Sequence, residues 1–322
     1  MSLVVAIADY AARFTVRSEV AFDAARRHLI EALARGFESL REPECAALIG
    51  PLVPGAVMPG GARVPGTSLE LDPAQAAFCL GVMLCRSATA EDWLDLPYGC
   101  GAASLGAVLA MADYRARKAR MEGKSPPTVR HLLAASIKAL EIQGVLAPVS
   151  GEPLPWAASL HLVHLAVAAV AAAQLGGTPR QIIQAVSYTS LDGGISTAAE
   201  QPWHRARRDW IVAEAMSRAV RHACRAVTSD GASPPTAIDL EIPELLDRSS
   251  ATAFGTEFIA RRSERASPRE IARVAMRFQS AVERYFPARQ AERIKVLFAS
   301  PARLDDLPVN ELLAALVTNG AR

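Results

Sequence analysis

Residues 160–175 read LHLVHLAVAAVAAAQL, and this stretch decides the fold class. It is apolar nearly all round a helix, with only His161, His164 and Gln174 interrupting it. A helix that is apolar on every side needs other apolar elements around it. The run is also too short, and too interrupted by histidine, to span a bilayer comfortably. We therefore expect a helix at the centre of a bundle, with no membrane as partner.

Helical periodicity extends over most of the chain on either side of this stretch. Ser18–Leu40 carries an apolar stripe with Ser18 available as N-cap, and Asp72 caps a helix that begins at Pro73, where a missing N–H costs nothing. Because apolar stripes need mutual burial, we predict an all-α domain of roughly eight to ten helices. The other helical segments are 102–121, 128–146, 178–191, 207–227, 268–300 and 307–317.

Two stretches lack this periodicity. Ile49–Pro73 is rich in proline and glycine and is predicted to be an extended excursion packed over the bundle. Between Thr236 and Pro268 turn-forming residues are frequent and large apolar residues are few, with room for a short strand at 237–242. We interpret this second stretch as a connector.

Bulk composition excludes several classes of function. The 322 residues carry 35 basic and 33 acidic side chains, a net charge of +2, which favours neither nucleic acid nor an anionic membrane as partner. The five scattered cysteines form no CxxC pair, so neither a disulfide framework nor a metal site is indicated. The N-terminus lacks the features of a signal peptide, which makes the cytoplasm the expected location.

Residues 40–81, LREPECAALIGPLVPGAVMPGGARVPGTSLELDPAQAAFCLG, resemble the N-terminal region of the MmgE/PrpD family. Further matches follow in the same order at 139–147, 207–223 and 286–317, so the resemblance covers Ala6 to Ala226 and again Phe278 to Val317. It implies a large helical domain built from both chain ends, with a smaller α/β domain inserted late.

This chain has no room for that second domain. The resemblance therefore divides it into residues 1–235, the N-terminal part of the helical domain; 236–268, a connector and vestige of the small domain; and 269–322, the helices that complete the helical domain. A connector of only 33 residues, with few large apolar side chains, cannot enclose its own core. We expect a pocket that is open to water, which weakens electrostatic stabilisation of a charged transition state.

The resemblance also implies a reaction. Members of the family remove water or carbon dioxide from small polycarboxylates, such as a methylcitrate-like acid, without an iron–sulfur cluster, so no cofactor is expected. In such a reaction a base takes a proton next to a carboxylate while an acid assists the leaving hydroxyl.

The segment 87–106, SATAEDWLDLPYGCGAASLG, aligns without a gap to the family's site loop but differs in its chemistry. An aspartate of the family pattern falls on Ala88, a threonine on Asp92 and a histidine on Cys100. Alanine cannot exchange a proton, and a thiol acts as an acid or base only with a tuned pKa. Asp92 and Cys100 are thus the positional equivalents of catalytic residues.

Two further family positions are also changed. A histidine falls on Ser159, and His161 lies two residues on, about 200° round the helix, so it cannot replace it. We expect His161 and His164 to serve as core or interhelical hydrogen-bonding residues. A lysine falls on Arg208, which stays protonated and suits carboxylate binding better than proton transfer. The neighbouring basic residues are His204, Arg205 and Arg207.

The basic group 204–208 has two interpretations, an anion-binding cluster at a helix start and a solvated basic turn. Three functions stay open: an active lyase with altered residues, a non-catalytic partner that forms a homodimer or pairs with a longer relative, and a repurposed anion pocket. Whether the chain is an enzyme is undecided at this level. Physical reasoning favours impaired or lost dehydratase activity, because several acid–base positions have changed together.

Overall fold

The structure of the chain is a computed structural model that describes residues 2–86, 101–147, 156–191, 208–229, 254–264 and 266–318. Helices dominate these ranges, and the strands found in them form one small two-stranded sheet, so the all-α prediction is confirmed. The described residues form fourteen α-helices, more than the eight to ten expected. Part of the excess comes from short helices whose few residues give no readable periodicity, such as α3 (Pro43–Ala46) and α14 (Pro301–Asp306). Another part comes from the division of the helix expected at 268–300 into two helices next to Pro287.

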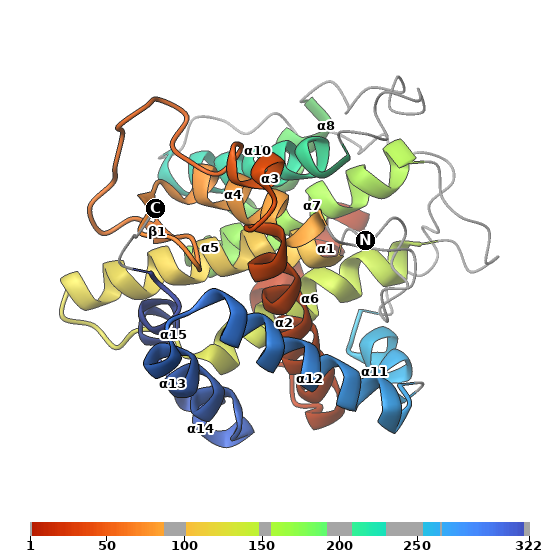
Figure 1. Ribbon diagram of the computed structural model, residues 1–322. Coiled ribbons are helices and arrows are strands. Elements are labelled where there is room, and N and C mark those ends of the chain that lie inside the picture. The colour runs from red at the N-terminus through yellow and green to blue at the C-terminus, as the bar shows by residue number, and fades with distance from the viewer. Residues whose placement is uncertain are drawn as a thin grey trace.

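The N-terminal two thirds of the chain supply the body of the bundle (Figure 1). Its helices are α1 (Leu3–Arg13), α2 (Glu19–Ser39), α3 (Pro43–Ala46), α4 (Pro73–Cys85), α5 (Gly101–Met121), α6 (Val129–Leu146), α7 (Trp156–Gln174), α8 (Pro179–Leu191) and α10 (Arg208–Thr228).

Helix α7 lies at the centre, as its sequence predicts. It packs against α1, α5, α6, α8 and α10, and apart from His161 every residue from Ala158 to Ala172 is buried. Across the described residues, no helix combines the length and apolarity that crossing a bilayer would require.

Local capping signals locate two helix starts correctly. The Ser18 hydroxyl accepts the N–H of Ala21 at 3.3 Å and begins α2. The Asp72 carboxylate accepts the N–H groups of Ala74 and Gln75, both at 3.0 Å, and Pro73 occupies the first position of α4. Each cap satisfies N–H groups that would otherwise lack a partner at a helix start.

The proline-rich excursion differs from its prediction. It contains a short antiparallel pair, β1 (Ala62–Arg63) and β2 (Glu70–Leu71), which was not expected. Residues 51–59 extend away from the helices (Figure 1), and Leu52 and Val53 are 85% and 63% exposed. The expected packing over the bundle is therefore wrong for this part of the excursion.

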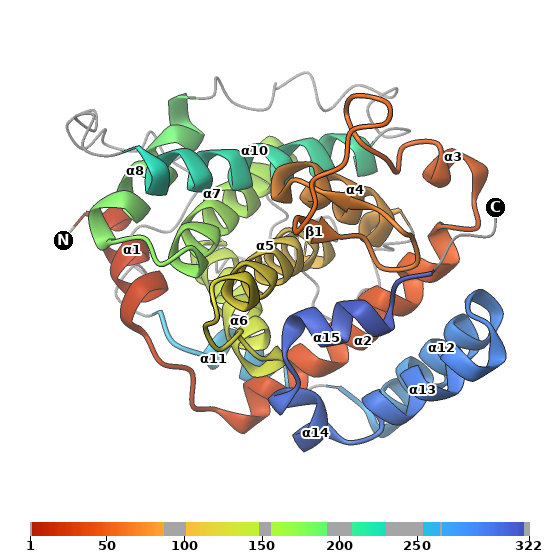
Figure 2. The same ribbon diagram turned by 90° about the vertical axis from the view of Figure 1, so that its left-hand side faces the viewer.

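The C-terminal helices return to the start of the chain. Helix α12 lies along α2, and α14 and α15 contact α6 and α5, so both chain ends build one helical body (Figure 2). Helix α11 lies in the stretch interpreted as a connector and was not expected. The helices of this region are α11 (Glu257–Glu264), α12 (Pro268–Tyr285), α13 (Ala288–Phe298), α14 (Pro301–Asp306) and α15 (Val309–Ala315).

Candidate functional site

Most residues predicted for the site lie outside the described residues. These are Ala88, Asp92 and Cys100 in the segment 87–100, and His204, Arg205 and Arg207 in the segment 192–207. Arg208 is the first residue of α10, although its side chain is not described. What the structure provides is the position of the helices that flank both segments.

Arg86, the last described residue before the first of these segments, contacts the start of α10, which follows the second. Its Nη1 lies 3.0 Å from Oδ2 of Asp209, the residue after Arg208, and its Nε lies 2.6 Å from Oε2 of Glu42. A further hydrogen bond joins Arg86 to Glu44. The end of α4 is thereby held against the start of α10.

The start of α5 comes to the same end of the bundle. Arg117, near the end of α5, donates to Glu70 at 2.7 Å just before α4 begins, so α4 and α5 run in opposite directions. Gly81 of α4 and Gly106 of α5 allow the backbones of these two helices to approach closely, since a Cβ on Gly106 would lie 3.0 Å from the Leu80 Cβ. We call the end where α4 ends and α5 and α10 begin the site end of the bundle.

His28, on α2, covers the first turn of α5. Its Nε2 lies 3.2 Å from the carbonyl oxygen of Gly101, the residue after Cys100, and must donate because a carbonyl only accepts. Burial is the largest cause that lowers the pKa of His28, to about 4, against the opposing effect of this hydrogen bond. His28 is therefore a neutral donor at pH 7, and the sequence had shown it only as a member of a helical stripe.

Other polar groups beside this turn are also engaged. The hydroxyl of Ser104 accepts Nε2–H of Gln143 from α6 at 2.8 Å, and both side chains are buried. One turn along α2 from His28, Glu31 and Arg35 form a buried ion pair at 2.8 Å. These contacts position the start of α5. Its first turn consists of the small residues Gly101, Ala102 and Ala103.

The first half of α7 carries several buried polar groups. Ser159 and His164 are each 2% exposed, and within the part of the chain that the structure describes the Ser159 Oγ and the Nε2 atoms of His161 and His164 have no hydrogen-bond partner. The His164 ring stacks on His222 of α10 at 5.4 Å between centroids, and burial lowers the pKa of His164 well below its usual value. The expected core position of His164 is confirmed, with ring stacking in place of an interhelical hydrogen bond at Nε2.

The described residues contain no group of three or more His, Cys, Asp or Glu side chains that could hold a metal ion.

Comparison of the sequence with known proteins identifies the family to which this helical chain belongs. Residues 5–240 match the MmgE/PrpD N-terminal domain, and the chain belongs to this family. It is 40% identical over 228 residues to 2-methylcitrate dehydratase of Escherichia coli K12 and 41% identical over 229 residues to that of Cupriavidus necator. The mitochondrial 2-methylcitrate dehydratase of Yarrowia lipolytica is 35% identical over 231 residues.

These alignments cover 70% to 71% of this chain but only 44% to 47% of each relative. The chain thus spans about half the length of the curated relatives it matches. The fold and family follow directly from the match, whereas the activity of a whole relative does not.

Proposed function

We propose that the chain keeps the helical scaffold of a 2-methylcitrate dehydratase while its dehydratase activity is impaired or lost. The observation that carries this proposal is the site end of the bundle. There α5 and α10 begin beside the end of α4, next to the two segments whose acid–base positions are changed. The scaffold is retained, and the exchanges fall on the groups that would move protons.

Four positions carry the expected loss. Ala88, Cys100, Ser159 and Arg208 stand where the family pattern has aspartate, histidine, histidine and lysine. A positioned acid or base contributes a factor of about 10²–10⁴ in rate, and the effects within one site do not simply add. His28 does not make up for them, because it is buried, its pKa of about 4 makes it a poor base at neutral pH, and its Nε2–H donates to the Gly101 carbonyl.

Substrate binding is proposed for the basic group His204, Arg205, Arg207 and Arg208. Arg208 opens the 21-residue helix α10, where the helix dipole favours an anion. Arginine holds a carboxylate through two parallel hydrogen bonds, so a small polycarboxylate suits this group. Binding can then persist where turnover does not.

Restoring the family's proton-transfer groups tests the proposal. The double variant C100H/R208K should raise the dehydration rate of 2-methylcitrate by about 10²-fold over the wild type, followed by the absorbance of the new conjugated double bond. The matched control is C224H/R225K, which makes the same two exchanges near the other end of α10. It should leave the rate unchanged. Wild-type turnover that Cys100→Ala abolishes would instead establish an active lyase with altered residues.

A role as a binding or regulatory partner is supported by a different observation. The excursion exposes Leu52, Val53 and Val57 at 85%, 63% and 69%, and exposed apolar groups of this kind favour association. We propose a homodimer or a complex with a longer relative in the cytoplasm. Light scattering after gel filtration, with and without a full-length dehydratase, decides between these assemblies and a monomer.

A further inference from the structure

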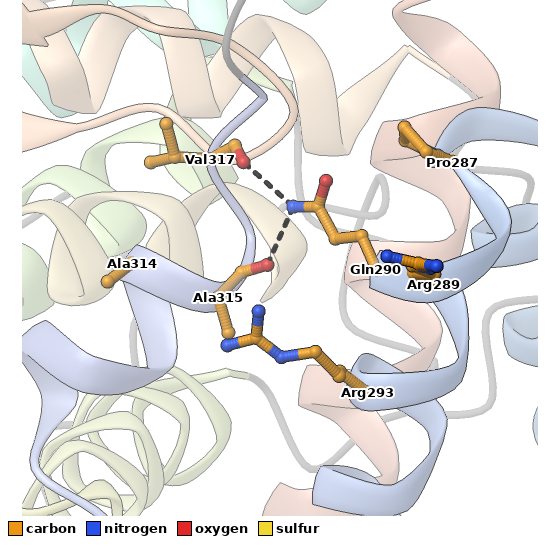
Figure 3. Close-up of a pocket in the computed structure, with 7 residues that line it drawn as sticks. All are labelled: Pro287, Arg289, Gln290, Arg293, Ala314, Ala315 and Val317. Atoms are coloured by element: carbon orange, nitrogen blue, oxygen red, sulfur yellow. Dashed lines mark hydrogen bonds between the residues drawn. The ribbon is translucent and has the colours of Figure 1, made fainter.

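A cleft of about 340 Å³ opens between the start of α13 and the end of α15, in a part of the chain that the proposed function does not use (Figure 3). Its volume lies in the range of small-molecule sites. The lining residues are Pro287, Arg289, Gln290, Arg293, Ala314, Ala315 and Val317.

The two walls of the cleft are fixed to each other. The Gln290 side-chain amide donates to the carbonyl oxygens of Ala315 and Val317, at 2.9 and 2.8 Å (Figure 3). A single side chain of α13 thus bridges to the last residue of α15 and to the segment that follows it. The cleft is formed before any ligand arrives, which lowers the ordering cost of binding.

Two positive charges line the cleft without a carboxylate among the lining residues. Arg289 and Arg293 lie one turn apart on α13, and both are exposed. The one acidic residue of α13, Glu292, pairs with Lys295 at 2.9 Å, and the one acidic residue of α15, Glu311, pairs with Arg120 at 3.9 Å. The acids on both walls are therefore engaged elsewhere.

The backbone adds to the positive potential. Pro287 is the N-cap of the 11-residue helix α13, and the first turn of this helix contains no acidic residue. The positive end of the helix dipole therefore lies at the mouth of the cleft, beside Arg289 in the first turn. On the opposite wall Ala314 and Val317 present small apolar side chains.

We propose that this cleft is an accessory site for a small organic anion, with a carboxylate or phosphate group bound between Arg289 and Arg293. Arginine pairs suit both of these groups, because each offers oxygens that accept two parallel N–H donors. The apolar part of the ligand lies against Ala314 and Val317. This site does not depend on dehydratase chemistry, since it shares no residue with the site end of the bundle.

The test titrates the full chain with butyrate, acetate and inorganic phosphate, observed through the ligand NMR signals at low salt. Butyrate should bind at least about threefold more tightly than acetate because of its apolar chain. Phosphate distinguishes a phosphate site from a carboxylate site. The variant R289A/R293A should raise the Kd of the preferred probe by about tenfold or more.

Two further variants make the result decisive. A314F fills the cleft at an exposed position while keeping both arginines, and it should weaken binding as well. R269A/R273A removes an exposed arginine pair of the same spacing on α12, outside the lining, and should change the Kd less than about twofold. The proposal is overturned if the wild type binds none of the probes, if R289A/R293A or A314F binds as well as the wild type, or if R269A/R273A loses as much affinity. Each outcome leaves the dehydratase assay unaffected.

Discussion

Two sets of helix contacts hold the molecule together by different means. One joins α4, α5 and α10, and the other joins α2 to the C-terminal helices. The first is apolar and depends on glycines: a Cβ on Gly81 would lie 2.8 Å from the Ala213 Cα. The second relies heavily on charge, with Asp305 of α14 accepting from Arg26 at 2.8 and 2.7 Å and from Arg130 at 3.0 Å. Steric changes should damage the first contact most, and changes of charge the second.

The largest effect is expected at the apolar contact. Gly81→Val should destabilise the chain by about 3 kcal/mol, because the added side chain cannot fit between α4 and α10 without moving backbone atoms. Chemical denaturation measures the loss. Gly50→Val is the control, since a Cβ on Gly50 has no atom within 4 Å. Equal losses in the two variants would show that the close approach of α4 and α10 is unimportant.

A smaller loss is expected at the charged contact. Asp305→Ala removes the partner of two arginines, and since the side chains of Arg26 and Asp305 are only 10% and 6% exposed, it should cost about 2 kcal/mol. Asp306→Ala, at the exposed neighbouring position, is the matched control and should change stability by less than about 0.5 kcal/mol. A cost for Asp305→Ala no larger than that of the control would mean that α14 is held by apolar packing alone.

The distance along the chain between contacting residues explains which elements the sequence could predict. The starts of α2 and α4 were predictable because Ser18 and Asp72 accept N–H groups two or three residues away, and because Pro73 fits the first position of a helix. Helix α11 was not, because residues distant in sequence stabilise it. The carboxylate of Glu141 accepts the N–H of Ile259 at 2.8 Å, and Gly144 leaves space that the Phe258 ring fills.

In the candidate site, too, the positions set by local sequence pattern were predictable and the contacts between distant residues were not. The alignment of 87–106 and 204–208 assigned positions to Asp92, Cys100 and Arg208 from local pattern, and the structure adds that Arg86 holds the helix end beside one segment to the helix start beside the other. His28 could not be identified this way. Its contact with Gly101 spans 73 residues, and nothing in an apolar stripe marks a histidine as a donor to a distant helix.

The buried Glu141 links α6 to α11. Burial is the main cause that raises its pKa to about 7, against the lowering effect of the Ile259 and Phe258 N–H groups. A carboxyl whose pKa is higher in the folded state than the usual 4.5 contributes stability at low pH and loses it as pH rises through 7. Hydrogen exchange in Glu257–Glu264 should therefore accelerate between about pH 4.5 and 7 and level off above that range, after correction for the intrinsic exchange rate.

Glu141→Gln separates this effect from general pH dependence. The amide oxygen can still accept the Ile259 N–H, so the corrected exchange of α11 should become independent of pH, with a gain of about 1 kcal/mol at pH 8. His28 provides the opposite sign, because its lowered pKa of about 4 costs stability as pH falls from 6.5 towards 4. His28→Gln should remove only the loss of stability that occurs as pH falls below 6.5. If Glu141→Gln left the pH dependence of α11 intact, the charge on Glu141 would not be what loosens this helix.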